Sequence, residues 1–239
     1  MYAGGGEQTQ GQVTGVDKAV VALHKLAAKY HQPQWLSFDV QFRYAAETQP
    51  ATWLDSLGGQ YKLHGNRFWS ILDDQVSIND GQLQLMVFAE DKLLMLARAG
   101  SNAGAGPVSM LDSFLVIQKE GNYQFTTTAT EEVIEISFPG PGMYKKLAWH
   151  IDKQSGYLNK MVSVLPANQL YDPSVRALVN GGSDAYVIVE TLYRHYQQGA
   201  FTEGVFNLGK YIKKKGRRMC RLHRMKTIKC FWEVGDCNR

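Results

Sequence analysis

The residue types that most often carry catalysis or hold metals are scattered along this chain. Its histidines show no HExxH pattern and no i, i+4 pairing of the kind that places two metal ligands on one helix face: His24, His31, His64, His150, His195 and His223. No nucleophile elbow, phosphate-binding loop or dinucleotide-binding fingerprint occurs either. We therefore predict a protein that is not an enzyme and needs no cofactor or metal.

Two clusters of chemically capable side chains still need an interpretation. Glu131, Glu132 and Glu135 form a carboxylate group, but strand alternation puts Glu135 on the solvated side, which favours an ordinary surface over acid–base work. Cys220, His223, Cys230 and Cys237 are zinc-ligand types whose spacing matches no known finger pattern. Cys230 and Cys237 are alternatively a disulfide loop, and three cysteines leave one sulfur unpaired.

The charge is concentrated at the end of the chain. Residues 210–239 hold 11 of the 26 Lys and Arg but only 2 of the 22 Asp and Glu, a local net charge of +9. Such a tail could neutralise phosphates of nucleic acid or of anionic lipid. Two other interpretations are a disordered charged tail, or a non-native ending produced by a shifted reading frame.

The elements that would position any site are mainly strands. The chain has 239 residues, 44% of them hydrophobic, and no apolar run approaches the roughly 20 residues of a membrane-spanning helix. Apolar residues at three- and four-residue spacing predict an amphipathic helix over residues 17–30. After Pro33, alternating Phe38, Val40, Phe42 and Tyr44 predict a half-buried strand.

Short strands separated by tight-turn residues then follow one another. They are expected at residues 60–64, 67–72, 75–79, 82–88, 92–98, 123–128, 133–138, 147–151, 158–165 and 186–196. Such hairpins join antiparallel strands, and this many strands must close, curl or be covered. The predicted fold class is mainly β with helices (α+β). A curled antiparallel sheet would form an unclosed barrel, covered by the N-terminal helix and by a short helical lid at residues 108–118.

One face of this sheet is expected to be apolar. Alternation predicts that the bulky groups of residues 76–87 and 134–151 share one face, which is either the core or an apolar pocket for an acyl chain. The residues predicted to line the pocket are Phe42, Trp69, Leu85, Val87, Ile136, Trp149 and Ile151.

The order of these segments resembles the LolA-like family of periplasmic lipoprotein carriers. The resemblance is carried by the alternating aromatics of residues 38–44, Gly59-Gln60-Tyr61, Phe68-Trp69, the run from Val76 to Leu85, and the acidic turn Glu90-Asp91. It implies an unclosed barrel under helices that shields lipoprotein acyl chains between membranes. Family members often carry Arg-Pro before the aromatic strand, where the arginine latches the lid. Here the turn has His64 and Arg67, which are the latch candidates.

We therefore expect three regions and one leading function. Residues 1–15 would be a flexible Gly/Gln-rich leader, residues 16–212 a LolA-like half-barrel domain, and residues 213–239 a basic, cysteine-containing tail. The leading hypothesis is an exported, periplasmic, monomeric carrier, without its signal peptide, that binds acyl chains and membrane-associated partner proteins but no nucleic acid. The alternatives are binding of anionic membrane or nucleic acid through the tail, and a structural envelope protein with a filled barrel.

Overall fold

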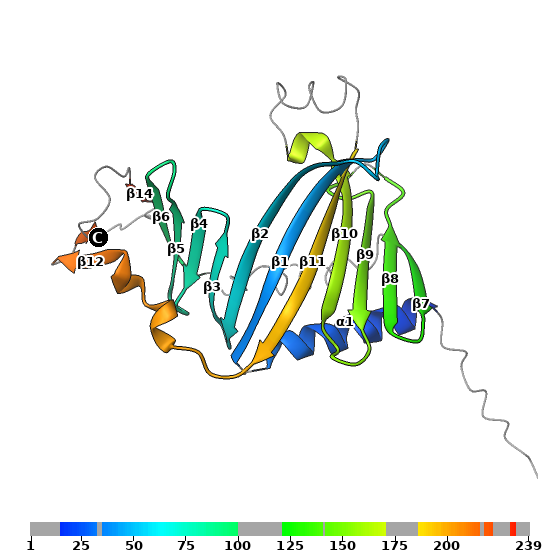
Figure 1. Ribbon diagram of the computed structural model, residues 1–239, viewed down its shortest axis with the longest axis horizontal. Helices are drawn as coiled ribbons and strands as arrows, with labels where there is room; N and C mark the ends of the chain where they lie inside the picture. The colour runs from blue at the N-terminus through cyan, green and yellow to red at the C-terminus, as the bar shows by residue number, and fades with distance from the viewer. Residues whose placement is uncertain are drawn as a thin grey trace, which may run out of the picture.

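The computed structural model describes residues 15–32, 35–99, 121–140, 142–170, 186–215, 218–221 and 230–232. Within these ranges the protein is built from one α-helix and one large sheet (Figure 1). The expected leader (residues 1–14 of it) and the expected lid at residues 108–118 lie outside the described residues. The model has no helix in its described part that is long and apolar enough to cross a membrane.

The helix α1 spans Gly15–His31, as the periodicity predicts. Asp17 in its first turn and Lys29 with His31 in its last turn complement the helix dipole. Its buried stripe packs against the sheet: Ala19, Ala22, Leu23, Leu26, Ala27 and Tyr30.

The sheet has twelve strands in the order β14-β6-β5-β4-β3-β2-β1-β11-β10-β9-β8-β7. All neighbours pair antiparallel except β14, which runs parallel to β6. β7 and β14 are the two edges, so the sheet is not closed into a barrel, and the predicted fold class is confirmed in this respect. The strands are β1 Trp35–Ala46, β2 Trp53–His64, β3 Arg67–Leu72, β4 Gln75–Asn79, β5 Leu83–Phe88, β6 Leu93–Arg98, β7 Asn122–Thr127, β8 Glu131–Ser137, β9 Lys146–Asp152, β10 Leu158–Pro166, β11 Tyr186–Gln198 and β14 Cys230–Trp232.

The main core lies between α1 and the concave face of the sheet. In Figure 1 the helix runs across the lower ends of β7 to β11. Phe38 of β1 stacks on Tyr61 of β2, with ring centroids 5.4 Å apart, and both belong to the same buried cluster as Leu23 and Leu26 of α1. A left-handed residue, His195 with φ of 54°, shifts the alternation of β11 so that Tyr193 and Tyr196 both join this cluster.

A second core lies on the opposite face of β3 to β6. The register pairs Asp39, Gln60, Ile71, Val76, Val87 and Leu94 in one row, whereas Phe38, Tyr61, Ser70, Ser77, Met86 and Met95 form the neighbouring row on the α1 side. The prediction that residues 76–87 and 134–151 share one face is therefore wrong. Alternation separates the two faces of each strand, but it does not tell which face will be covered.

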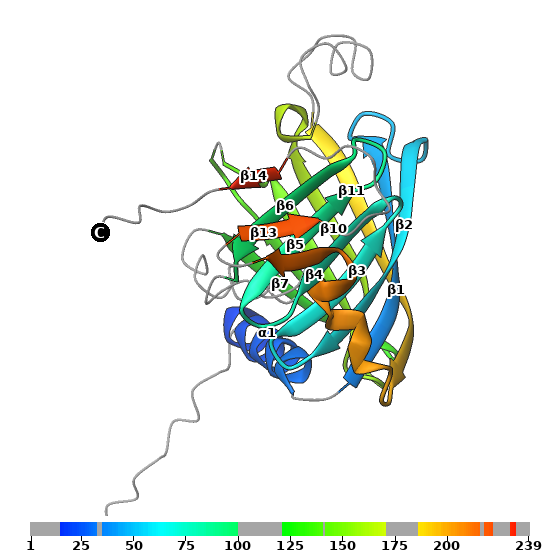
Figure 2. The ribbon, with the colours of Figure 1, turned by 90° about the vertical axis from the view of Figure 1, so that its left-hand side faces the viewer.

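The cover of this second core is the segment that follows β11. It consists of two 3-10 turns, η2 Glu203–Phe206 and η3 Leu208–Lys210, and leads into β12 Ile212–Lys215, which pairs with β13 Arg218–Arg221. Figure 2 shows this segment crossing in front of β3 to β6. We call residues 203–212 the strap. Leu208 is buried in the second core, and Tyr211 and Ile212 pack against it.

Candidate functional site

The concave face of the sheet, from β1 to β6, carries apolar side chains that are only partly covered. We call this set the concave stripe: Phe42, Leu57, Leu72, Met86, Phe88, Leu93 and Met95. Met95 is 42% exposed, and the other six have intermediate exposure. Apolar side chains of intermediate exposure differ from those of a filled core, which lose nearly all contact with water.

The register of the sheet places the stripe residues on neighbouring strands, with the polar Gln75 and Ser77 of β4 between its two groups. Met86 pairs with Met95 across β5 and β6, and Phe88 pairs with Leu93 one step along the same face. Gln75 connects Phe88 to Leu72 of β3, and the same row passes through Gly59 to Val40. Phe42 pairs with Leu57 in the adjoining row of β1 and β2. The stripe residues therefore come from five strands, β1, β2, β3, β5 and β6, and Gln75 of β4 lies between them.

Gly59 is needed for the path of this surface between β2 and β3. A Cβ atom at Gly59 would lie 2.1 Å from the Ile71 carbonyl oxygen and 2.6 Å from Leu72 Cδ2. The absent side chain lets Leu72 lie directly over the β2 backbone. Gly59 is thus a strand residue that shapes the stripe.

The concave side is an environment of low polarity. The polar members of the rows that contain the stripe are neutral, namely Gln75, Ser70 and Ser77. Burial raises the pKa of Tyr61 to about 12, and the hydrogen bond to Ser70 only partly offsets this effect. Such a surface can hold an alkyl chain.

The seven predicted pocket residues fall on both sides of the sheet. Phe42 belongs to the concave stripe, and Ile136, Trp149 and Ile151 lie deeper in the main core on the same face. Trp69, Leu85 and Val87 lie on the opposite face, in the second core under the strap. The structure therefore brings four of the seven together.

Sequence reasoning missed most of the stripe because strand alternation assigns its residues to the more polar side of their strands. In β4 and β5 the concave phase contains Gln75, Ser77 and Gln84 beside Met86 and Phe88. A usable signal was nevertheless present, since β5 and β6 are apolar on both phases, as in Leu83–Phe88 and Leu93–Ala97. Strands of that composition are expected to be covered, or used, on both faces.

The latch candidates His64 and Arg67 contact each other, and Arg67 also contacts the strap. Arg67 Nη2 donates a hydrogen bond to His64 Nδ1 at 2.5 Å and lies 3.2 Å from Glu203 Oε1. The His64 ring stacks on Trp35 at 3.9 Å, and the Arg67 guanidinium lies over Phe206. A groove of about 440 Å³ adjoins Arg67, Glu203 and Leu208 at this junction. Through Arg67 the β2–β3 hairpin is thus joined to the strap.

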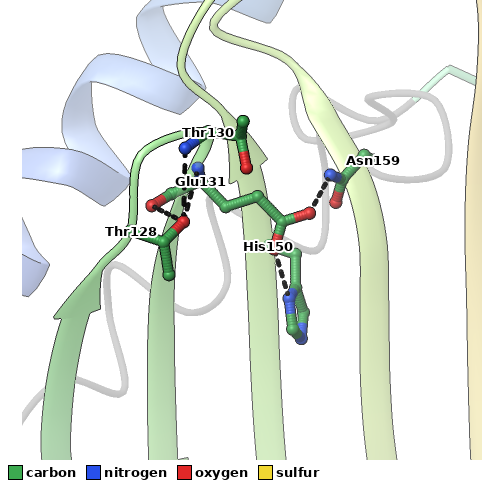
Figure 3. A network of polar contacts seen from close by, with 5 residues as sticks. All are labelled: Thr128, Thr130, Glu131, His150 and Asn159. Carbon is green, nitrogen blue, oxygen red and sulfur yellow. Dashed lines mark hydrogen bonds and ion pairs between the residues drawn. The ribbon is translucent and has the colours of Figure 1, made fainter.

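A polar network on the outer face involves one of the carboxylates singled out above (Figure 3). Glu131 accepts hydrogen bonds from Asn159 and pairs with His150, and these contacts lower its pKa. Thr128 Oγ1 accepts from the backbone amides of Thr130 and Glu131. The lowered pKa keeps Glu131 ionised. Its contacts with His150 and Asn159 join β8 to β9 and β10. Glu135 pairs at the surface with Lys146 at 2.7 Å.

Metal ligation finds no support in the described part of the chain. No group of three His, Cys, Asp or Glu side chains comes together there. His223 and Cys237 of the candidate zinc set lie outside the described residues, so that hypothesis and the disulfide remain predictions.

Fold and site together define an unclosed antiparallel half-barrel with a helix and an apolar stripe on its concave face. Among solved structures, the chain is similar in fold to an uncharacterised conserved protein from Thermus thermophilus (8% identity, 90% of this chain and 99% of that one, TM-score 0.49). It is also similar to a LolA superfamily protein from Nitrosomonas europaea (11% identity, 79% of this chain and 97% of that one, TM-score 0.36). A third is a putative outer membrane lipoprotein-sorting domain from Vibrio parahaemolyticus (11%, 82% and 98%, TM-score 0.35).

Two of these three structures are of the LolA-like kind that the sequence resembles, and the likeness is one of fold alone. Neither a protein-family model nor a curated protein matches the sequence.

Proposed function

We propose that the protein is a non-enzymatic carrier or binding protein that shields acyl chains of a lipid or lipoprotein on the concave stripe. The observation that carries this proposal is a set of partly exposed apolar side chains on the curved side of the sheet, from β1 to β3 and in β5 and β6, with the neutral Gln75 and Ser77 of β4 between the two groups. Burial of an alkyl chain there is favourable by about 0.8 kcal/mol for each methylene removed from water.

The flexible and polarizable methionines fit this role. Met86 and Met95 lie directly opposite each other, with Phe88 and Leu93 in the next row. Methionine adapts to alkyl chains of different shape, whereas a branched core residue does not. The cargo would therefore be recognised by its alkyl surface rather than by one fixed head group. The proposal includes a monomeric protein in the periplasm whose partners are acyl chains and membrane-associated proteins.

A charge placed in the stripe tests this function. In Met95→Glu the carboxylate would have to lose water beside the alkyl chain, so we expect affinity for a dansyl-labelled fatty acid to fall at least about tenfold. Fluorescence titration of the purified protein measures the affinity. Because Met95 is already exposed, the substitution should leave the fold intact, as circular dichroism can check.

Met143→Glu is the matched control, because Met143 is 63% exposed in the β8–β9 loop, outside the stripe. It should bind the fatty acid as the unmodified protein does. The proposal fails if the unmodified protein takes up no fatty acid, or if the two glutamate variants lose affinity equally.

A further inference from the structure

Four of the seven large hydrophobic side chains that are exposed in the described residues gather at one end of the sheet. They are Trp53 and Leu54 at the start of β2, Met143 in the β8–β9 loop and Leu170 after β10, each at least 40% exposed. The strand registers place these segments together, since the end of β1 lies beside the start of β2 and of β11, and β10 ends opposite the start of β11. Figure 1 shows these strand ends at the top of the molecule. We call this end the hairpin end.

The loops at the hairpin end are fastened to one another. Glu47, in the β1–β2 connection, pairs with Lys145 of the β8–β9 loop at 2.6 Å. The Glu47 amide donates to the Tyr186 carbonyl, and the Lys145 ammonium lies over the Tyr186 ring. The Lys145 amide donates to the Val164 carbonyl of β10. The exposed apolar groups are thus carried on a connected platform rather than on independent loops.

The charges of the platform are already neutralised. Arg43 lies 3.8 Å from Glu190 and stacks over Trp53, while Lys145 is paired with Glu47. The turns that end β3 and β5 at the same end are acidic, with Asp73-Asp74 and Glu90-Asp91. Among the described residues, both platform cations are therefore paired, and the turn at Glu90-Asp91 adds one lysine, Lys92, to two carboxylates, so these groups do not favour an anionic partner.

An exposed indole beside leucine and methionine, with paired cations, suits the boundary between lipid head groups and acyl chains. We propose that the hairpin end docks on the surface of an electrically neutral lipid bilayer. The concave stripe reaches the same end, because Phe88 and Leu93 flank the β5–β6 turn. A docked protein would therefore present the stripe to the bilayer. The role of the docking rests on the proposed carrier function, but the docking itself can be tested independently of it.

Flotation with phosphatidylcholine vesicles tests the docking. The full chain should float with the vesicles. The double variant Trp53→Ser with Leu54→Ser lacks two apolar side chains whose transfer from water to the bilayer favours binding, so its partition coefficient should be at least about tenfold lower. The matched control is Val16→Ser with Val21→Ser on α1, whose valines are similarly exposed but lie away from the hairpin end. This control should float like the unmodified protein.

Binding to vesicles that contain phosphatidylglycerol should be no tighter, and added salt should not weaken it. Docking at the hairpin end is overturned if the full chain does not float, or if both double variants lose binding equally. It is also overturned by tight, salt-sensitive binding to anionic vesicles only, which would assign the contact to the basic tail. Fatty-acid uptake by the Trp53/Leu54 variant should stay normal in solution, so failure of docking and failure of the carrier function give different results.

Discussion

At the scale of single residues, the anchoring of α1 depends on tyrosines. Tyr30 of α1 and Tyr196 of β11 share a hydrogen bond of 2.5 Å between their hydroxyl groups, and Tyr157 stacks on Tyr196 at 4.5 Å. Burial raises the pKa of Tyr30, Tyr193 and Tyr196 above the ordinary value of 10.0. These side chains must stay protonated for the helix to remain seated on the concave face.

This arrangement predicts an alkaline limit to stability. A pKa raised in the folded state means that the stabilisation is complete below pH 10 and is lost as the pH rises through the folded pKa, which for Tyr61 is about 12. Urea unfolding should therefore give a free energy that is level from neutral pH to about pH 9 and falls steeply above pH 10.

Tyr61→Phe removes one titrating group and serves as the comparison. Its free energy of unfolding should be lower at neutral pH, because the contact with Ser70 is lost, but should fall less steeply above pH 10. A free energy that does not change up to pH 12 would contradict the assignment.

At the scale of elements, the strap decides which face of β3 to β6 is core. Its attachment combines the ion pair of Arg67 with Glu203 and the buried side chains of Phe206 and Leu208. The ion pair is partly exposed and is expected to contribute little, so burial dominates. Without the strap, Ile78, Leu85 and Val87 would face water.

Truncating the strap should therefore loosen one half of the sheet. Leu208→Ala is expected to lower the free energy of unfolding by about 2 kcal/mol and to speed amide hydrogen exchange in β3 to β5 more than in β8 to β10. Leu170→Ala is the control, because Leu170 is 40% exposed and its truncation should change stability by less than about 0.5 kcal/mol. Equal acceleration of exchange in both halves would show that the strap does not act locally.

The same element explains why sequence reasoning could reach the fold but only part of the site. Period-two alternation and tight-turn residues predict β3 to β11 within a few residues, and apolar residues at three- and four-residue spacing predict α1. The face that each strand turns to α1 depends on the strap and on the shift at His195, neither of which alternation reveals. For this reason Ile136 and Trp149 were assigned to the correct face, whereas Leu85 was not.

At the scale of the whole molecule, the sheet separates two apolar surfaces that have different roles. The outer surface of β3 to β6 is covered by the strap of the same chain, whereas the concave stripe between α1 and the hairpin end keeps intermediate exposure. The unclosed order of strands, with β7 and β14 at the edges, lets one side of a curved sheet stay accessible. Acyl chains are accordingly expected on the concave side alone.

Photochemical labelling tests this central claim most directly. A fatty acid with a diazirine on its alkyl chain is irradiated with the full chain, and the labelled residues are located by peptide mass spectrometry. The account predicts labels on the concave stripe, above all on Met86, Phe88, Leu93 and Met95. Labels confined to the strap and the outer face around Trp69 and Leu83, or label uptake that an excess of unlabelled fatty acid does not reduce, would contradict it.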